Sequence, residues 1–257
     1  MQSMKKNLIL LSGLFIGLGL SSCNGSASYV PTKIEGNKIA IDSSWDKAPN
    51  ENAVNILSRY KLGVDSVMNE VVGFAPETLV KNRPESPLSN LVADVLRLAA
   101  KETLGKPADI GLVNMGGIRN ILPAGDITVG TVFEILPFEN SLCILEIKGV
   151  AVKELMKNIA KVQGEGISNI ELKSTASGEV LPAKVGGKLI EDEKMYTVAT
   201  IDYLAEGNDG MTALMQSESR VCPEGATLRS LFMNYIKDQT AKGSKITAKI
   251  EGRMILE

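Results

Sequence analysis

Helix-like and strand-like segments alternate along the chain, and this alternation limits the folds that the chain can adopt. Apolar residues recur at helical spacing in three segments: 88–104, 150–162 and 228–238. Short runs typical of strands occupy four others: 109–114, 142–148, 195–200 and 246–255. The long hairpin-like stretches, as in 167–200, argue against a purely parallel sheet. We therefore predict an α+β fold with mixed sheets and flanking helices.

The first of the three helical segments has the clearest start signal. Ser86 offers a hydroxyl cap, and Pro87 suits the first turn of a helix. Before this helix, Lys33–Ile41 alternates loosely and is predicted to be a strand or a hairpin. Val64–Phe74 is predicted to be a further strand, ended by Pro76.

The chain contains no histidine among its 257 residues, which excludes several kinds of chemistry. Ser-His-Asp and Cys-His catalysis both require an imidazole, and so do the usual His-rich zinc, iron and copper sites. A net charge of −2 and an aromatic content of 4% do not suit a surface that tracks nucleic acid. We therefore expect no nucleic-acid partner.

The amino terminus is typical of a secretory signal peptide. Lys5 and Lys6 precede an apolar run, Leu8–Leu20, that is shorter than the roughly 20 residues needed to span a bilayer. The following Leu20-Ser21-Ser22-Cys23 resembles the bacterial lipobox, which implies cleavage before Cys23 and acylation of that residue. The alternative is an ordinary signal peptide with an incidental cysteine.

We expect three parts in the chain: a lipoprotein signal peptide at 1–22, a lipidated tether at 23–32, and a folded domain at 33–257. Several acyl chains on Cys23 would anchor the mature protein stably, because one chain alone binds only marginally. The expected location is the bacterial cell envelope, facing the periplasm or at the outer membrane. Cys143 and Cys222 remain in the mature chain. Cys143 lies in a strand-like run, and this position favours its interpretation as a buried free thiol. The sequence leaves open whether Cys143 and Cys222 form a disulfide.

The most unusual segment is Asn114-Met115-Gly116-Gly117-Ile118-Arg119, which follows a predicted strand. Two glycines let the backbone turn sharply there, so that Asn114 and Arg119 project near the strand end. The planar guanidinium of Arg119 suits a phosphate or a carboxylate. The alternative is a structural ion pair, for example with Asp126.

Two later loops carry further candidate ligand contacts. Leu136-Pro137-Phe138-Glu139-Asn140 places a ring just before the 142–148 strand, although such rings often fill gaps in a core. Tyr203 and Asp209 follow the 195–200 strand, and an Asx turn is the default explanation of Asp209. Together the segments supply two rings for a flat base, an arginine for phosphate and a carboxylate for ribose hydroxyls. That combination describes a nucleotide site.

With these motifs in this order, the chain resembles the carboxyl-terminal, substrate-binding domain of the 5'-nucleotidase and UDP-sugar hydrolase family, roughly from Val64 onward. The resemblance implies a layered α/β/β/α fold. It also implies that Phe138 and Tyr203 clamp the base and that Asn114 contacts it, with Asn140 supporting the base or the Phe138 loop. Arg119 would bind phosphate, Asp209 would bind the ribose hydroxyls, and Gly116 and Gly117 would shape the turn.

The chain departs from the family pattern at several positions. Glu139 stands where the family has glycine, Tyr203 where phenylalanine is common, and Asn208 interrupts a double glycine. The family's additional phosphate-binding arginines have no clear counterpart, and Arg83 is a loose candidate. Gly164-Glu165-Gly166 lacks the spacing of a phosphate-binding loop and is predicted to be a turn.

The family's metallophosphoesterase domain, which holds two divalent metals, cannot fit in residues 24–63. We therefore expect no metal and no catalytic residue in this chain, negligible hydrolysis by the chain alone, and the two metals on a separate metallophosphoesterase chain. The leading hypothesis is a lipid-anchored nucleotide-binding module of a split 5'-nucleotidase that acts in nucleotide catabolism. The alternatives are a non-enzymatic nucleoside- or nucleotide-binding lipoprotein and a degenerate assembly module.

Overall fold

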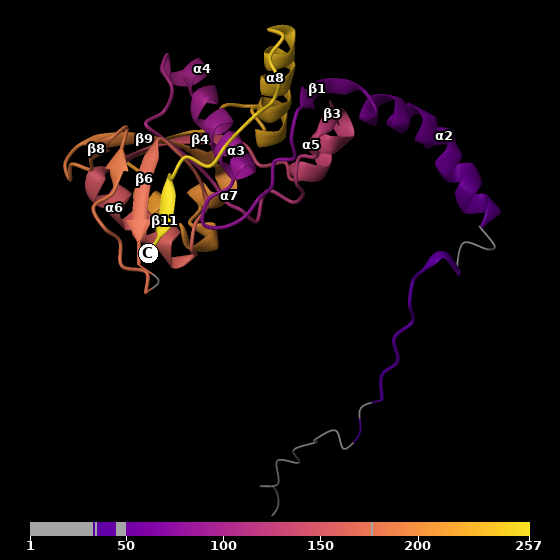
Figure 1. Cartoon of the computed structure of the whole chain (residues 1–257), viewed down its shortest axis with the longest axis horizontal. Coiled ribbons are helices and arrows are strands. Elements are labelled where there is room, and N and C mark those ends of the chain that lie inside the picture. The colour runs from indigo at the N-terminus through magenta and orange to yellow at the C-terminus, as the bar shows by residue number, and fades with distance from the viewer. Residues whose placement is uncertain (1–32, 34, 45–49, 176) are drawn as a thin grey trace, which may run out of the picture. The chain divides into compact units, whose positions relative to one another are not determined.

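The structure is a computed structural model that describes residues 33, 35–44, 50–175 and 177–257. Within it, Asn52–Glu257 forms one compact unit, and its elements are labelled in Figure 1. The predicted signal peptide and tether lie outside the described residues and stay predictions. Residues 33 and 35–41 are exposed and carry no strand, so the strand predicted at Lys33–Ile41 is wrong there. Their loose alternation has no sheet partner to bury one face.

The main sheet has five strands in the order β10-β4-β9-β2-β5. The bounds are β2 Ile110–Val113, β4 Leu142–Lys148, β5 Gly166–Ser168, β9 Met195–Ile201 and β10 Ser219–Val221. β2 and β9 are parallel, whereas the other neighbours are antiparallel. The predicted α+β fold with mixed sheets and flanking helices is therefore confirmed.

Two smaller sheets complete the strands. One pairs β1 with β3 and the other has the order β11-β6-β7-β8, with β11 parallel to β6. The bounds are β1 Val71–Ala75, β3 Gly125–Thr128, β6 Ile170–Ser174, β7 Lys184–Val185, β8 Lys188–Leu189 and β11 Met254–Leu256. The long strand predicted at 246–255 is wrong, because only its last two residues belong to β11.

The predicted helices are present, and others accompany them. Their bounds are α3 Pro87–Ala99, α4 Lys101–Leu104, α5 Val129–Ile135, α6 Gly149–Lys161, α7 Asp202–Ala205 and α8 Leu228–Ala241, with 3-10 turns η2 Asn208–Gly210 and η3 Thr212–Gln216. Ser86 caps α3 in a capping box with Ser89, as the start signal indicated. α3 packs closely on β2, since a Cβ on Gly111 would lie 2.5 Å from the carbonyl oxygen of Ala93.

The segment before β1 corrects the prediction of a strand at Val64–Phe74. Glu51–Met68 is a helix, α2, and the strand begins only at Val71. The apolar side chains of Leu57, Tyr60 and Val64 continue the helical spacing of the preceding residues, which the strand prediction overlooked. No residue of α2 is buried. In the described part of the chain, we find no helix with the length and hydrophobicity that a bilayer crossing requires.

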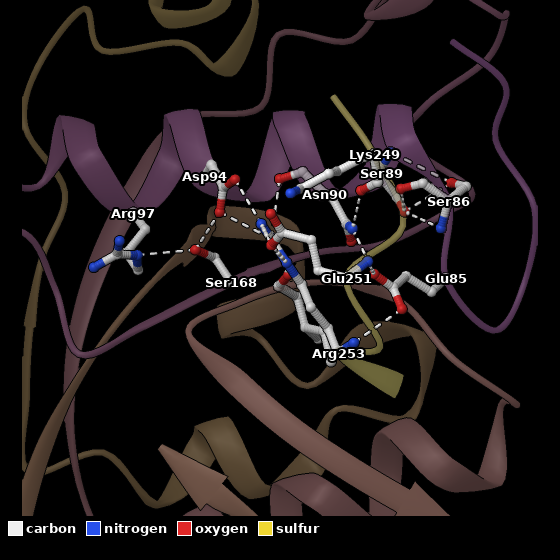
Figure 2. Close-up of polar contacts among 11 residues, drawn as sticks. Glu85, Ser86, Ser89, Asn90, Asp94, Arg97, Ser168, Lys249, Glu251 and Arg253 are labelled. Carbon is white, nitrogen blue, oxygen red and sulfur yellow. Dashed lines mark hydrogen bonds and ion pairs between the residues drawn. The ribbon is translucent and has the colours of Figure 1, made fainter. Parts of the chain in front are cut away.

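A polar cluster attaches the carboxyl-terminal segment to α3 (Figure 2). The buried carboxylate of Glu85 accepts hydrogen bonds from the backbone N–H groups of Glu251, at 2.7 Å, and Arg253, at 2.9 Å. The guanidinium of Arg253 in turn donates to both carboxylate oxygens of Asp94, at 2.8 and 2.7 Å. Because a carboxylate satisfies these two N–H groups, they need no partner on a neighbouring strand.

Cys143 and Cys222 form a disulfide, which corrects the expectation of a free thiol at Cys143. Val221 of β10 lies opposite Ile144 of β4, so the antiparallel register places the next residue, Cys222, opposite Cys143. Their Cα atoms are 4.2 Å apart. The pairing depends on β10, a short exposed strand that the sequence pattern did not predict.

Candidate functional site

The three predicted segments meet at one edge of the main sheet. β2 and β9 run parallel, so their carboxyl ends lie at the same edge, and Leu142 at the start of β4 pairs with Ile201 at the end of β9. A cavity of about 350 Å³ lies among the segments that adjoin these three strand ends. It is lined by Asn114, Gly116, Gly117, Phe138, Asn140, Tyr203 and Asp209. Seven of the eight predicted binding residues therefore surround a single cavity.

The first wall of the cavity is the turn that follows β2. Asn114 is buried, and its backbone oxygen accepts a hydrogen bond from the N–H of Gly117 at 3.1 Å. A Cβ on Gly117 would lie only 2.7 Å from the side-chain oxygen of Asn114. Glycine is therefore required where the backbone folds beneath the asparagine side chain.

Asp209 is held from two sides. Its Oδ2 accepts from Asn114 Nδ2 at 2.6 Å, and its Oδ1 accepts from the Tyr203 hydroxyl at 3.0 Å. The backbone of Asp209 is left-handed, with φ of 52°. The hydrogen bond to Asp209 is the main reason that the pKa of Tyr203 is raised. Tyr203 therefore stays protonated and keeps donating.

Asn114 makes a contact beyond the role that the resemblance implied, and its contact with the base stays a prediction. Its amide nitrogen donates to the carboxylate of Asp209. Its amide oxygen is buried and makes no hydrogen bond within the described residues. The side chain therefore orients Asp209.

Two aromatic rings lie on the same cavity. Phe138 is 47% exposed and Tyr203 is 41% exposed, so neither ring fills a gap in the core. The guanidinium of Arg119 lies 5.8 Å from the centre of the Phe138 ring. Arg119 does not line the cavity itself but stands beside one of its rings. Arg119 makes no ion pair among the described residues, so the alternative pairing with Asp126 is not found.

Lys81 joins Arg119 near the cavity and was missed by the sequence analysis. Its ammonium group donates to the carbonyl oxygens of Met115, at 3.4 Å, and Ile118. Burial is the main cause that lowers the pKa of Lys81, and the positive charges of Arg119 and Arg83 lower it further. Both guanidinium groups are thus close enough to Lys81 to repel its charge. Such a cluster favours an anion.

Glu165 supports this cluster, although its segment was predicted only as a turn. Its side chain is 1% exposed and accepts from Arg83 Nη2 at 2.6 Å and from the backbone N–H of Met115. Burial raises the pKa of Glu165, while the contacts with Met115 and Arg83 oppose the increase. Arg83 is therefore partly neutralised. A single carboxylate between glycines carries no sequence signal for such burial.

Glu139, the departure beside Phe138, does not line the cavity. Its carboxylate forms an ion pair with Arg229, at the start of α8, and is 72% exposed. Arg229 was not predicted as a site residue. Only the fold brings it to this loop, because it lies 93 positions after Leu136, whose carbonyl oxygen it contacts at 3.3 Å.

A larger cavity, of about 890 Å³, lies elsewhere, between α3 and the carboxyl-terminal segment. Its central charges are already paired with one another, because Arg253 contacts both Asp94 and Glu251 (Figure 2). Ser168 also donates to Asp94, at 2.5 Å. This network explains how the segment is held, and it leaves the smaller cavity as the candidate site.

The described part of the chain shows no cluster of side chains suited to a metal ion. No group of three or more acidic or cysteine side chains there could hold a metal ion. The expectation that this chain carries no metal remains a prediction. The cavity offers an aspartate, amides, rings and nearby cations, which are groups that bind and orient a ligand.

Comparisons with known proteins identify the family of this chain. The family described as 5'-nucleotidase, C-terminal domain, matches residues 69–216. The trifunctional nucleotide phosphoesterase protein YfkN of Bacillus subtilis is 30% identical over 84% of this chain and 16% of that protein. Protein UshA of Yersinia enterocolitica is 32% identical over 69% of this chain and 33% of that protein.

Solved structures extend the comparison to the fold. The 5'-nucleotidase precursor of Thermus thermophilus is 29% identical, with a TM-score of 0.68 over 82% of this chain and 44% of that chain. The NAD nucleotidase of Haemophilus influenzae is 20% identical, with a TM-score of 0.59 over 81% of this chain and 41% of that chain, and shares the fold. The chain thus spans less than half the length of each of these relatives.

Proposed function

Because the chain belongs to the 5'-nucleotidase C-terminal domain family, we propose that its cavity binds a nucleotide as the substrate-binding part of a split 5'-nucleotidase. One observation carries the proposal: residues from three distant segments, chosen from sequence motifs, line one cavity with cations beside it. A cavity of about 350 Å³ is within the range of small-molecule sites. The proposed reaction is hydrolysis of a nucleotide phosphate in nucleotide catabolism.

The chemistry of the lining suggests how a nucleotide would lie. Phe138 and Tyr203 offer ring faces on which a base can stack. Asp209, oriented by two hydrogen bonds, has further lone pairs for the hydroxyls of a ribose. Arg119 and Lys81 supply positive charge for the phosphate, with Arg83 weakened by its ion pair to Glu165.

The chemical step is assigned to a partner. Two divalent metals on a separate metallophosphoesterase chain would supply the activated water and stabilise the leaving oxygen. This chain would supply binding energy and hold the phosphate ester toward the partner. Relatives such as YfkN are much longer than this chain, which leaves room in them for a catalytic domain.

Attachment to the cell envelope is the other part of the proposal. Its support is the signal-like run Leu8–Leu20 followed by Leu20-Ser21-Ser22-Cys23. Acylation at Cys23 would place the binding domain beside a membrane, periplasm-facing or at the outer membrane, with about 0.8 kcal/mol per buried CH2 group. Metabolic labelling with a fatty acid, compared between the parent and Cys23→Ser, tests this part. Equal labelling of the two proteins would rule it out.

The alternatives differ from the leading proposal in how the cavity is used. A nucleotide-binding lipoprotein without a partner would use the same residues. A degenerate assembly module would not need them, and two departures favoured it: Glu139 and the missing phosphate-binding arginines. Because Glu139 pairs with Arg229 and does not line the cavity, that departure leaves the pocket open.

Calorimetric titration of the parent with AMP, adenosine and UDP-glucose tests nucleotide binding. Phe138→Ala should weaken AMP binding by about 1 to 3 kcal/mol, because one stacking face is lost. Tyr203→Ala should show a similar loss. Tyr60→Ala is the matched control, since Tyr60 is exposed on α2 and does not line the cavity. Absence of binding by the parent would reject the proposal, and parent-like binding by both site variants would reject the stacking role.

A further inference from the structure

The loop that carries Phe138 and Asn140 is built against the start of α8. The N–H of Leu228 donates to the carbonyl oxygen of Asn140 at 2.8 Å, and the N–H of Leu142 donates to that of Ala226 at 2.8 Å. These two bonds fix the carboxyl-terminal end of the loop. They leave the residues around Phe138 to be held by side chains.

Arg229 contacts the loop on both sides of Phe138. Its Nη1 donates to the carbonyl oxygens of Leu136, at 3.3 Å, and Pro137, at 3.0 Å. Its Nη2 forms the ion pair with Glu139, the residue after Phe138. The guanidinium also lies 4.1 Å from the centre of the Phe133 ring. The Arg229 side chain is 11% exposed, whereas the Glu139 side chain is 72% exposed, so the guanidinium is largely buried and its carboxylate partner faces water.

From these contacts we infer that Arg229 is a positioning residue that sets the Phe138 ring for base stacking without touching the nucleotide. The inference rests on the proposed nucleotide binding and deepens it. Stacking requires a ring in a fixed plane, and an unrestrained loop would lose conformational entropy on binding. Arg229 removes that cost in advance by holding the chain on either side of the ring.

The chemistry of arginine suits this task. Its planar fork presents several N–H donors in a fixed geometry, so one side chain can serve two carbonyls, a carboxylate and a ring face. Lysine offers a compact charge without that fork. Arg229→Lys should therefore keep the ion pair with Glu139 and lose part of the hold on the carbonyls.

Glu139 gives Arg229 a second task in this chain. An unpaired carboxylate next to Phe138 would disfavour a negatively charged ligand nearby. The ion pair with Arg229 neutralises that charge and draws it toward α8. The two residues thus act as a pair. If glycine replaces Glu139, no carboxylate charge remains for Arg229 to neutralise.

The test is a calorimetric double-mutant cycle on the full chain with AMP, adenosine and inorganic phosphate. Arg229→Met should weaken adenosine binding roughly tenfold, the effect of about one charged hydrogen bond, and should weaken phosphate binding less, because phosphate loses only the neutralisation of Glu139. In a Phe138→Ala background the same change should add almost nothing to the loss of adenosine affinity, because the ring that Arg229 positions is gone. Adding Glu139→Gly to Arg229→Met should restore part of the AMP affinity.

Lys237→Met is the control, because it removes an exposed ion pair with Glu70 from the same helix. If Arg229→Met does not fold, Arg229→Lys takes its place, with a smaller loss of AMP affinity expected. Equal losses with and without Phe138, or an equal loss of phosphate binding, would show a general structural role and overturn the inference. The inference is also overturned if the parent binds AMP and both Arg229 variants bind AMP as tightly as the parent does. A parent that binds neither nucleotide nor nucleoside instead rejects the proposed function.

Discussion

At the scale of single residues, the cavity depends on hydrogen bonds that orient one carboxylate. Asp209 adopts a left-handed backbone that is uncommon for a residue other than glycine. Tyr203 and Asn114 occupy one oxygen each and fix the direction of the carboxylate. The tyrosine that replaces the family's usual phenylalanine therefore adds a contact and keeps the ring.

Removal of the Tyr203 hydroxyl should affect ligands that contain ribose. Tyr203→Phe keeps the ring but leaves Asp209 with one fewer restraint, so AMP and adenosine should bind roughly two- to tenfold more weakly. Free adenine should bind to the variant and the parent alike, because stacking is retained. Titration calorimetry with the three ligands measures the difference. An equal loss for adenine would assign the effect to the ring instead of the carboxylate.

Glu165 should make stability depend on pH. Burial raises its pKa in the folded protein above the ordinary 4.5, so the folded state retains the proton when the unfolded chain has lost it. The contribution of this group to stability is therefore largest below pH 4.5 and falls as pH rises through the folded pKa. Urea unfolding at a series of pH values measures the free energy of unfolding. As pH rises from 4.5 through the folded pKa of Glu165, this free energy should fall less for Glu165→Gln than for the parent. Parallel curves for the two proteins would contradict the raised pKa.

At the scale of elements, the site depends on strand ends that are held in register. β4, β9 and β2 are adjacent, and the segments adjoining their ends form the cavity. β10 extends the sheet beside β4, and the disulfide joins the residue after β10 to Cys143 near the start of β4. Because the Phe138 loop leads directly into β4, the bond also anchors the strand that follows this loop.

Breaking the disulfide should destabilise the domain more than it weakens ligand binding. The bond closes a loop with a sequence separation of 79 residues, and loss of such a cross-link typically costs about 2 to 4 kcal/mol. The double variant Cys143→Ala, Cys222→Ala should therefore unfold at lower urea concentration than the oxidised parent. The reduced parent should behave like the variant. Unchanged unfolding midpoints would show that the bond does not contribute.

At the scale of the whole molecule, this chain covers only part of its relatives. It spans 44% of the Thermus thermophilus structure and 33% of Yersinia enterocolitica UshA. Its cavity can bind and orient a ligand, and the described residues show no group that could hold a metal. The split-enzyme proposal therefore assigns the chemical step to a second component.

Addition of the chain to the proposed metallophosphoesterase should lower the KM for AMP or raise kcat, because substrate-binding energy is supplied in trans. The Phe138→Ala chain should stimulate less than the parent, and the Tyr60→Ala chain should stimulate equally. Steady-state phosphate release with the two purified chains measures this effect, and copurification from membranes identifies the partner. No stimulation at saturating concentration would reject the split enzyme while leaving nucleotide binding intact.

The sequence by itself determined the local elements and the members of the cavity. Helical spacing, the Ser86 cap and strand alternation located α3, β4, α6, β9 and α8, because those signals depend on near neighbours. Motif order identified the lining residues. Those motifs consist of residue types that suit ligand binding. They can be recognised without knowledge of how the chain folds between them.

Only the tertiary structure decided which distant groups support that cavity. Arg229, Glu165 and Lys81 act through contacts with segments far away in the sequence, and the disulfide depends on the register of β10 against β4. A strand was predicted where α2 ends, and another where Glu85 and Asp94 hold the carboxyl-terminal segment. Local patterns do not encode such pairings, because burial and long-range hydrogen bonds are set by the assembled fold.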